Sequence, residues 1–249
     1  MKEVNFIKHI VSLSGGKDST AMLLKMIENN MQIDEIVYCE IMATSTLGGE
    51  YPEMYEYLDK LDKYLLKTIG KKITRLKPSV TFEEQFYTKK KRGKYKNEIY
   101  GFPLVFSAWC NSNLKTHTLD KYCKSQGEYI CYIGIAYDEP ERFKRLSENE
   151  KAPLYEWKMT ESDCLQYIKG KGLYNPLYDK FKRLCCWFCV KQSLDNLRIL
   201  RRDYPEYWNM LLEWQKDSKI RFRSDYTMQQ LEDKLQKEDY ISLNSTKAA

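Results

Sequence analysis

The chain has 249 residues, of which 43% are hydrophobic and 31% are charged. This composition is typical of a globular protein and excludes the disordered and collagen-like classes. A formal net charge of +6 favours anionic partners such as nucleotides and nucleic acids. The sequence contains neither a run of about 18 apolar residues nor the pattern of an export signal, so we expect a cytoplasmic protein with no membrane partner.

Eight cysteines are the second feature of the composition. In a reducing compartment they favour metal binding or thiol chemistry over a disulfide framework. Five of them are scattered, whereas Cys185, Cys186 and Cys189 crowd into five positions. This cluster is therefore the part of the cysteine pattern with functional interest.

Short apolar runs alternate with longer amphipathic segments through the first half of the chain. The short runs are rich in β-branched residues, and the longer segments carry apolar residues at helical spacing. Such alternation predicts an α/β fold in which helices flank both faces of a parallel sheet. We expect strands at residues 9–13, 35–41, 72–76 and 129–136, and helices at residues 18–29 and 52–69.

The second half of the chain is mainly helical in pattern. A lysine-rich polar segment at residues 88–101 reads as an exposed loop. Thr160 and Asp163 form a plausible capping box for a helix that runs to residue 169. We expect further helices at residues 192–202, 205–214 and 227–237, and hence a nucleotide-binding domain at 1–180 followed by a cysteine motif and helical extension at 181–249.

A glycine-rich turn, SLSGGKDS at residues 12–19, follows the first expected strand. Backbone N–H groups at a strand-to-helix turn face outward beside the positive helix end, which makes a cradle for an anion. Gly15 and Gly16 let the backbone approach a phosphate, and Lys17 adds a positive charge. Ser14 and Ser19 can donate hydrogen bonds from their hydroxyls. The turn lacks two positions of a Walker A loop, which disfavours motor-like NTPase chemistry.

The segment SGGKDS at residues 14–19 resembles the PP-loop of the ATP pyrophosphatases. Further segments at residues 109–115, 133–142, 153–157 and 186–189 resemble the phosphoadenosine phosphosulfate (PAPS) reductase family, in the branch similar to the DNA-phosphorothioation protein DndC. These similarities extend over most of the chain. They imply the adenine nucleotide alpha hydrolase-like fold of the PP-loop proteins.

The resemblance also implies an activity. The ATP pyrophosphatases that the chain resembles bind ATP with Mg²⁺, cleave it to AMP and pyrophosphate, and adenylate an acceptor. Here the acceptor would belong to a sulfur-transfer reaction on a nucleic acid or a small molecule, with a sulfur-donor protein as a further partner. The implied catalytic residues are Lys17, Asp18 and Arg142, and the implied nucleotide contacts are Ser12, Ser14, Gly15, Gly16, Lys17, Asp18 and Ser19.

Two departures from the family pattern bear on this reading. Family members commonly have Asp-Thr-Gly after the second strand, and this chain does not. Glu40, Glu50 or Glu53 could instead supply the ligand for magnesium or ribose. True sulfonucleotide reductases have an altered loop and a catalytic cysteine in the C-terminal tail. This chain keeps SGGKDS and has no cysteine after Cys189, which disfavours PAPS reduction by that route.

The cysteine cluster has metal-ligand spacing. Cys186 and Cys189 form a CxxC pair that can share one metal, and Cys185 offers a third thiolate. The family comparison nominates Cys110 as the fourth ligand of a [4Fe-4S] cluster or of zinc. If Cys185 points away, three ligands leave an open iron site. The alternative is that Cys185 and Cys186 are small core residues beside Trp187 and Phe188.

Two charged features have both a functional and a structural interpretation. Arg142 lies beyond the expected strand 129–136, where it could hold a phosphate or remain a solvated surface arginine. The basic run at residues 89–96 is flanked by tyrosines and could follow a nucleic-acid backbone, although most charge runs are solvated surface.

Three hypotheses remain. The leading one is an adenylating ATP pyrophosphatase in sulfur transfer. The second is a sulfonucleotide reductase or sulfate adenylyltransferase-like enzyme, which would turn over PAPS with thioredoxin. The third is a non-catalytic nucleotide sensor, which would bind nucleotide without turnover and carry structural zinc.

Overall fold

A computed structural model describes the backbone of residues 6–247 and the side chains of residues 6–241. Its centre is a five-stranded sheet in the order β3-β2-β1-β4-β5, in which every pairing is parallel. The predicted α/β fold class is confirmed. The strands are β1 (Lys8–Leu13), β2 (Glu35–Cys39), β3 (Ile73–Leu76), β4 (Tyr129–Ile133) and β5 (Glu150–Lys151).

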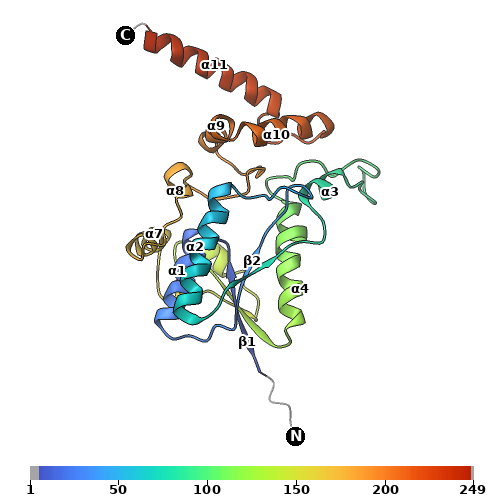
Figure 1. Ribbon diagram of the computed structural model, residues 1–249. Coiled ribbons are helices and arrows are strands. Elements are labelled where there is room, and N and C mark those ends of the chain that lie inside the picture. Colours follow the sequence, from blue (N-terminus) through green and yellow to red (C-terminus); the bar gives the residue numbers. More distant parts are fainter. Residues whose placement is uncertain (1–5, 248–249) are drawn as a thin grey trace. The chain divides into compact units, whose positions relative to one another are not determined.

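The order of the strands fixes where the helices lie. The crossovers from β1 to β2 and from β2 to β3 run in one direction along the sheet, so their right-handedness puts α1 (Lys17–Glu28) and α2 (Pro52–Ile69) on one face. The crossover to β4 returns in the opposite direction and puts α4 (His117–Ser125) on the other face (Figure 1). The order therefore reverses between β1 and β4, at the kind of switch point where open parallel sheets bind ligands.

Helix α2 shows how local sequence sets an element. Pro52 occupies its first turn, where the missing N–H costs nothing, and Gly70 ends it with φ +67°. Its buried side chains recur every three or four residues and pack toward the sheet, as an amphipathic helix requires. These side chains are Met54, Tyr57, Leu58, Leu61 and Leu65.

Short helices complete the part of the chain around the sheet. Helix α7 (Glu161–Gly170) begins at the predicted capping box: Thr160 Oγ1 accepts from the N–H of Asp163 at 3.2 Å, and Asp163 accepts from the N–H of Thr160 at 2.9 Å. Helix α7 packs against α1. The others are α5 (Pro140–Phe143), α6 (Pro153–Glu156) and α8 (Leu177–Lys180).

The remaining elements form an aromatic core of their own. The rings of Phe82 and Phe188 are 4.2 Å apart, and Trp187 stacks on Trp214 at 5.5 Å and on Tyr207 at 4.8 Å. Ring pairs of this kind bury large areas and stabilise beyond their area. The elements are α3 (Phe82–Tyr87), the π-helix η1 (Cys110–Thr116), α9 (Leu194–Asp203), α10 (Pro205–Asp217) and α11 (Met228–Lys247).

The chain divides into two compact units, each built from three segments. Of the described residues, the first holds 6–41, 50–78 and 115–184, and the second holds 42–49, 79–114 and 185–247. The domain division expected between residues 180 and 181 stays a prediction, because contacts within one chain do not test independent folding.

Several element bounds differ from those expected. Strand β4 ends at Ile133 rather than at residue 136, and the lysine-rich segment 88–101 folds back on itself through an antiparallel bridge between Lys89 and Ile99. Within residues 6–247, every helix is too short or too polar to cross a bilayer.

Candidate functional site

The glycine-rich turn lies at the carboxyl end of β1, beside the switch point of the sheet. Gly15 has φ +73°, and a Cβ on it would lie 2.6 Å from Sδ of Met54. Only glycine fits such a left-handed, crowded position. Gly16 caps α1 without a side-chain hydrogen bond, and the N–H of Lys17, the first amide of the helix, donates to Tyr178 Oη at 2.8 Å, a contact that a bound anion would have to replace.

Gly134, directly after β4, sets the position of this turn. A Cβ on Gly134 would lie 2.7 Å from both the N and Cα atoms of Ser19. The end of β4 therefore touches the first turn of α1, backbone against backbone. This close approach also explains why β4 stops before residue 136, since Ile135 donates back to Ile133 O at 2.9 Å instead of extending the strand.

The serines of the motif hold the turn together. The hydroxyls of Ser14 and Ser19 are 2.9 Å apart, and the N–H of Ser14 donates to Ser19 Oγ at 3.1 Å. Ser19 also donates to the carbonyl of Gly16 at 3.2 Å. Ser12 lies within β1, where its backbone pairs with Val37 and Ile133. Ser14 is exposed and can offer its hydroxyl to a ligand, whereas Ser19 is buried.

Lys17 is held by two carboxylates in this structure. Its Nζ donates to Glu161 at 2.5 Å and to Asp18 at 3.3 Å. Burial alone would lower the pKa of Lys17, but the hydrogen bond to Glu161 and the charge of Asp18 outweigh it and raise the pKa. The ammonium is therefore fully charged, and a phosphate that binds it must displace these partners.

Asp18 is the carboxyl of the turn, and its pKa is strongly shifted. Burial raises the pKa of Asp18 to about 6, although the charge of Lys17 acts to lower it. Within the described part of the chain, its buried Oδ1 accepts no hydrogen bond. A carboxyl of this kind is typical of functional sites, because a stable core seldom leaves a buried oxygen unsatisfied.

Three residues around the turn were missed by the sequence reasoning. Besides Glu161, Tyr178 Oη accepts from the N–H of Lys17 at 2.8 Å, and the buried Asn175 donates from Nδ2 to the carbonyl of Gly15 at 3.1 Å. They come from α7, α8 and the segment between them. No motif spacing links them to residues 14–19. The capping box before α7 was visible in the sequence. The sequence did not show that Glu161, the residue after Thr160, contacts Lys17.

Arg142 does not contact the turn in this structure. Its Nη1 donates to both carboxylate oxygens of Glu139 at 2.7 Å, and about half of its side chain is exposed. The negative charge of Glu139 is near enough to act on Asp18. The helix that carries Arg142 therefore follows the end of β4, as expected, and its contact with a nucleotide stays a prediction.

Two of the three acids suggested as magnesium ligands have basic neighbours. The Oε2 of Glu40, a buried residue after β2, lies 3.7 Å from Nζ of Lys77, and Glu53 accepts from Lys180 at 2.9 Å. Among the described residues, no three histidine, cysteine, aspartate or glutamate side chains are gathered closely enough to hold a metal ion. The geometry thus selects none of these acids as a ligand.

The cysteine cluster lies in a turn before α9, and no cysteine forms a disulfide. The N–H of Cys189 donates to the carbonyl of Cys186 at 3.0 Å. The three clustered cysteines are half-buried, whereas the intervening Trp187 and Phe188 are buried and fill the aromatic core. The alternative in which Cys185 and Cys186 are core residues is thereby disfavoured.

Cys110, the proposed fourth ligand, begins the π-helix η1. Burial and then the charge of Cys189 raise the pKa of Cys110 to about 11, so these two thiols lie within electrostatic range of each other. As stated for the acids, no three thiols converge on one point in the described chain. The donor chemistry suits iron or zinc, but the arrangement of thiols is not that of a metal site.

Comparison with known proteins identifies the family of the chain. Residues 8–192 match the phosphoadenosine phosphosulfate reductase domain. The chain is 27% identical over 232 aligned positions to the "uncharacterized nin region protein ORF290" of Escherichia phage lambda, covering 78% of this chain and 70% of that protein. A solved structure, the U34-tRNA thiolase NcsA from Methanococcus maripaludis with its [4Fe-4S] cluster, has a TM-score of 0.46 and 15% identity, covering 85% of this chain and 72% of that one. The family match spans most of the sequence, and the chain belongs to the phosphoadenosine phosphosulfate reductase domain family.

Proposed function

We propose that this protein is an adenylating ATP pyrophosphatase that acts in sulfur transfer. ATP binds with its phosphates on the turn at residues 14–19, is cleaved between the α and β phosphates, and activates an acceptor as its adenylate. One observation carries the proposal: a glycine turn at the switch point of a parallel sheet, with a charged lysine at the start of the following helix.

The residues of the turn have different roles in the proposed reaction. The amides around Gly15 and Gly16 and the Ser14 hydroxyl hold phosphate oxygens, and Ser12 and Ser19 keep the turn in shape. In-line attack on the α phosphorus requires mainly positioning and neutralisation of charge. Lys17 supplies this neutralisation once a phosphate replaces Glu161 as its acceptor. Mg²⁺ arrives bound to the phosphates of ATP, as part of the substrate.

Asp18 and Arg142 complete the proposed catalytic set. Asp18 orients the ammonium of Lys17 through its 3.3 Å contact. Arg142 can give a second positive charge to the nucleotide when its guanidinium leaves Glu139, which is the change its exposed position permits. The likeness to the DndC branch and the reducing, cytoplasmic setting remain parts of this proposal.

The substitution Lys17→Ala tests the proposal. We expect pyrophosphate release from ATP to fall to background, because the loop amides cannot alone neutralise the developing charge. Far-UV circular dichroism should be unchanged, since Lys17 is not part of the core. Lys63→Ala, on an exposed position of α2, is the matched control. An unchanged rate in Lys17→Ala would overturn the proposal.

The cysteines provide the sulfur side of the proposal. We propose Cys110, Cys185, Cys186 and Cys189 as ligands of a [4Fe-4S] cluster, with zinc as the alternative. Because the thiols do not converge here, no reaction step is assigned to the metal. The acceptor class, nucleic acid or small molecule, and a sulfur-donor protein belong to the same proposal.

Sulfonucleotide chemistry is the second candidate, and the name of the matched family, a phosphoadenosine phosphosulfate reductase domain, supports it. Purified protein offered PAPS with thioredoxin, in parallel with an ATP–pyrophosphate exchange assay, separates the two. Turnover of PAPS without ATP–pyrophosphate exchange would favour the second candidate. Nucleotide binding without turnover in either assay would instead favour the sensor hypothesis.

A further inference from the structure

A hairpin rich in lysine stands at one edge of the second compact unit. In this hairpin, residues 88–101, the N–H of Lys90 donates to Glu98 O at 2.8 Å and the N–H of Tyr100 donates to Thr88 O at 3.0 Å. Its base is fixed: a Cβ on Gly101 would lie 2.4 Å from Ser218 Oγ, and the N–H of Phe102 donates to that oxygen at 3.3 Å. The end of the hairpin is thus packed against Ser218.

Its positive charges are not neutralised. Among the described residues, none of the six lysines and arginines of the hairpin has an acidic side chain within ion-pair distance, although ion pairs are common elsewhere in the chain. Five of the six are exposed. Clustered cations without acidic partners form a surface that attracts a polyanion. The six are Lys89, Lys90, Lys91, Arg92, Lys94 and Lys96.

Aromatic rings are interleaved with these charges. Nζ of Lys90 lies 5.6 Å from the ring centroid of Tyr95 and 5.8 Å from that of Tyr100. Tyr95 is 53% exposed, so part of its ring is open to solvent. Exposed rings beside lysines are the combination with which proteins bind single-stranded nucleic acids, because each base has a face that can stack.

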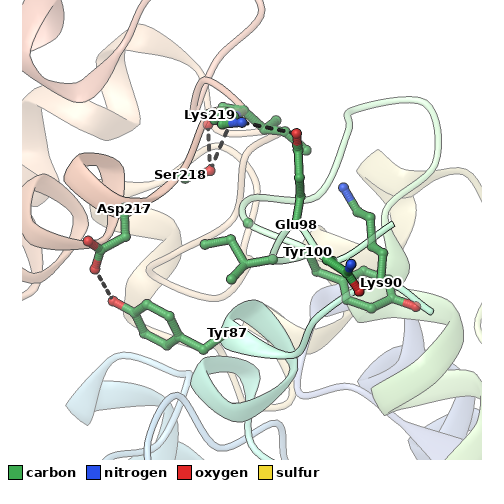
Figure 2. Close-up of a pocket in the computed structure, with 11 residues that line it drawn as sticks. Tyr87, Lys90, Glu98, Tyr100, Asp217, Ser218 and Lys219 are labelled. Carbon is green, nitrogen blue, oxygen red and sulfur yellow. Dashed lines mark hydrogen bonds and ion pairs between the residues drawn. The ribbon is translucent and has the colours of Figure 1, made fainter. Parts of the chain in front are cut away.

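A cavity of about 540 Å³ opens beside the hairpin. Tyr87 and Asp217 lie at one end of it and Lys90 and Tyr100 at the other (Figure 2). Tyr87 donates to Asp217 at 2.7 Å. Such a volume is in the range of small-ligand pockets and is large enough for a nucleobase.

The polarity of the cavity differs from that of the hairpin. Its carboxylates are Asp217 and Glu98, the latter paired with Lys219 at 2.9 Å. Carboxylates repel phosphate but accept hydrogen bonds from the amino groups of bases. The arrangement therefore places phosphates on the exposed hairpin cations and a base in the cavity.

We propose that hairpin 88–101 and this cavity bind a single-stranded segment of nucleic acid. The inference deepens the proposed function, since it names the acceptor class, but the binding itself requires neither ATP nor the cysteines. Lys17→Ala, which should abolish pyrophosphate release, should leave this binding unchanged. Pyrophosphate release and nucleic-acid binding therefore test the two proposals independently.

Fluorescence anisotropy with labelled 12-nucleotide strands, as RNA and as DNA of one sequence, tests the binding. The triple variant Lys91→Ala/Arg92→Ala/Lys94→Ala should bind at least about tenfold more weakly near 50 mM salt, and its dependence of log K on log salt should be shallower by about 2, for three lost phosphate contacts. The matched control removes three exposed lysines elsewhere, Lys63→Ala/Lys67→Ala/Lys124→Ala. Equal weakening in the control would overturn the proposal.

The stacking component has its own test. Tyr95→Leu keeps an apolar side chain at an exposed position, and should weaken binding by about 5-fold or more without changing the salt dependence. An abasic strand of equal length should bind wild type correspondingly less tightly. Equal affinity for the abasic strand, or for a duplex, would contradict base binding and overturn the inference. Whichever of RNA and DNA binds more tightly identifies the class of strand.

Discussion

At the residue scale, two carboxylates compete for one ammonium in the turn at residues 14–19. Glu161 and Asp18 both accept from Lys17, so the lysine is positioned and charged before any ligand arrives. The arrangement gives the half-buried ammonium of Lys17 two acidic partners, without which a charge at this position would be unpaired. If ATP binds here as proposed, displacing these carboxylates lowers its affinity.

Glu161→Gln should therefore strengthen ATP binding. The glutamine removes one competing charge while keeping the size of the side chain, and because Glu161 is about half exposed the pair is worth less than about 1 kcal/mol, so we expect the dissociation constant to fall about 2- to 5-fold. Isothermal titration calorimetry with ATP measures it. Glu141→Gln, which removes an equal charge from an exposed pair with Lys144, is the control. Weaker binding in Glu161→Gln would show instead that Glu161 assists the nucleotide.

Asp18 predicts a pH dependence of stability. Its pKa is about 6 in the folded protein against an ordinary value of 3.8, so between about pH 4 and 6 the folded state holds a proton that the unfolded state releases. The stability contributed by this group is present below pH 4 and is lost as the pH rises through 6. Asp18→Asn removes the loss, so the variant should gain on wild type as the pH rises, by at most about 3 kcal/mol at pH 7.

Urea denaturation at pH 4.5, 5.5 and 7, with EDTA and without nucleotide, measures this difference. Subtracting the wild type from the variant removes the contributions of the other carboxyls. Asp59→Asn, at an exposed aspartate of α2, should show no comparable gain with pH. A constant difference between Asp18→Asn and wild type across these pH values would mean that Asp18 ionises normally.

At the element scale, the sequence was informative wherever a local signal set a boundary. Pro52 and Gly70 bound α2, and the Thr160 capping box starts α7 as expected. Elements fixed by distant contacts were less predictable. The early end of β4 results from the approach of Gly134 to Ser19, and the fold of hairpin 88–101 depends on its base at Ser218, neither of which leaves a periodic pattern.

Gly134→Ala tests whether this contact between elements positions the nucleotide turn. The added Cβ would meet backbone atoms of Ser19, which cannot rotate away, so we expect a loss of about 1 to 3 kcal/mol of stability and weaker ATP binding. Gly170→Ala is the matched control, because a Cβ there meets nothing within 4 Å and the helix should gain up to about 1 kcal/mol. Thermal unfolding with and without ATP measures both. Normal ATP affinity in Gly134→Ala would show that the turn does not depend on this contact.

At the scale of the whole molecule, each compact unit carries one kind of chemistry. The turn proposed to bind phosphate belongs to the first unit, and all four proposed thiol ligands belong to the second. The sequence revealed both motifs, because SGGKDS and CxxC are contiguous. It could not reveal that residues 42–49 and 79–114 join the second unit, since membership of a unit is decided by contacts between distant segments. Cys110 was assigned to the thiols through family resemblance alone, and the structure does place it in that unit.

Analysis of metal content tests the second unit. Protein purified without oxygen should contain iron and acid-labile sulfide at about four of each per chain, and Cys110→Ser, Cys186→Ser or Cys189→Ser should each lose most of both. The control Cys39→Ala/Cys164→Ala removes two buried core cysteines and should keep the metal. Cys185→Ser distinguishes two forms of the site: loss of the cluster makes Cys185 the fourth ligand, and retention leaves three ligands and an open iron. Zinc without sulfide would replace the sulfur-transfer role with a structural one, and no metal under any condition would contradict the proposed site.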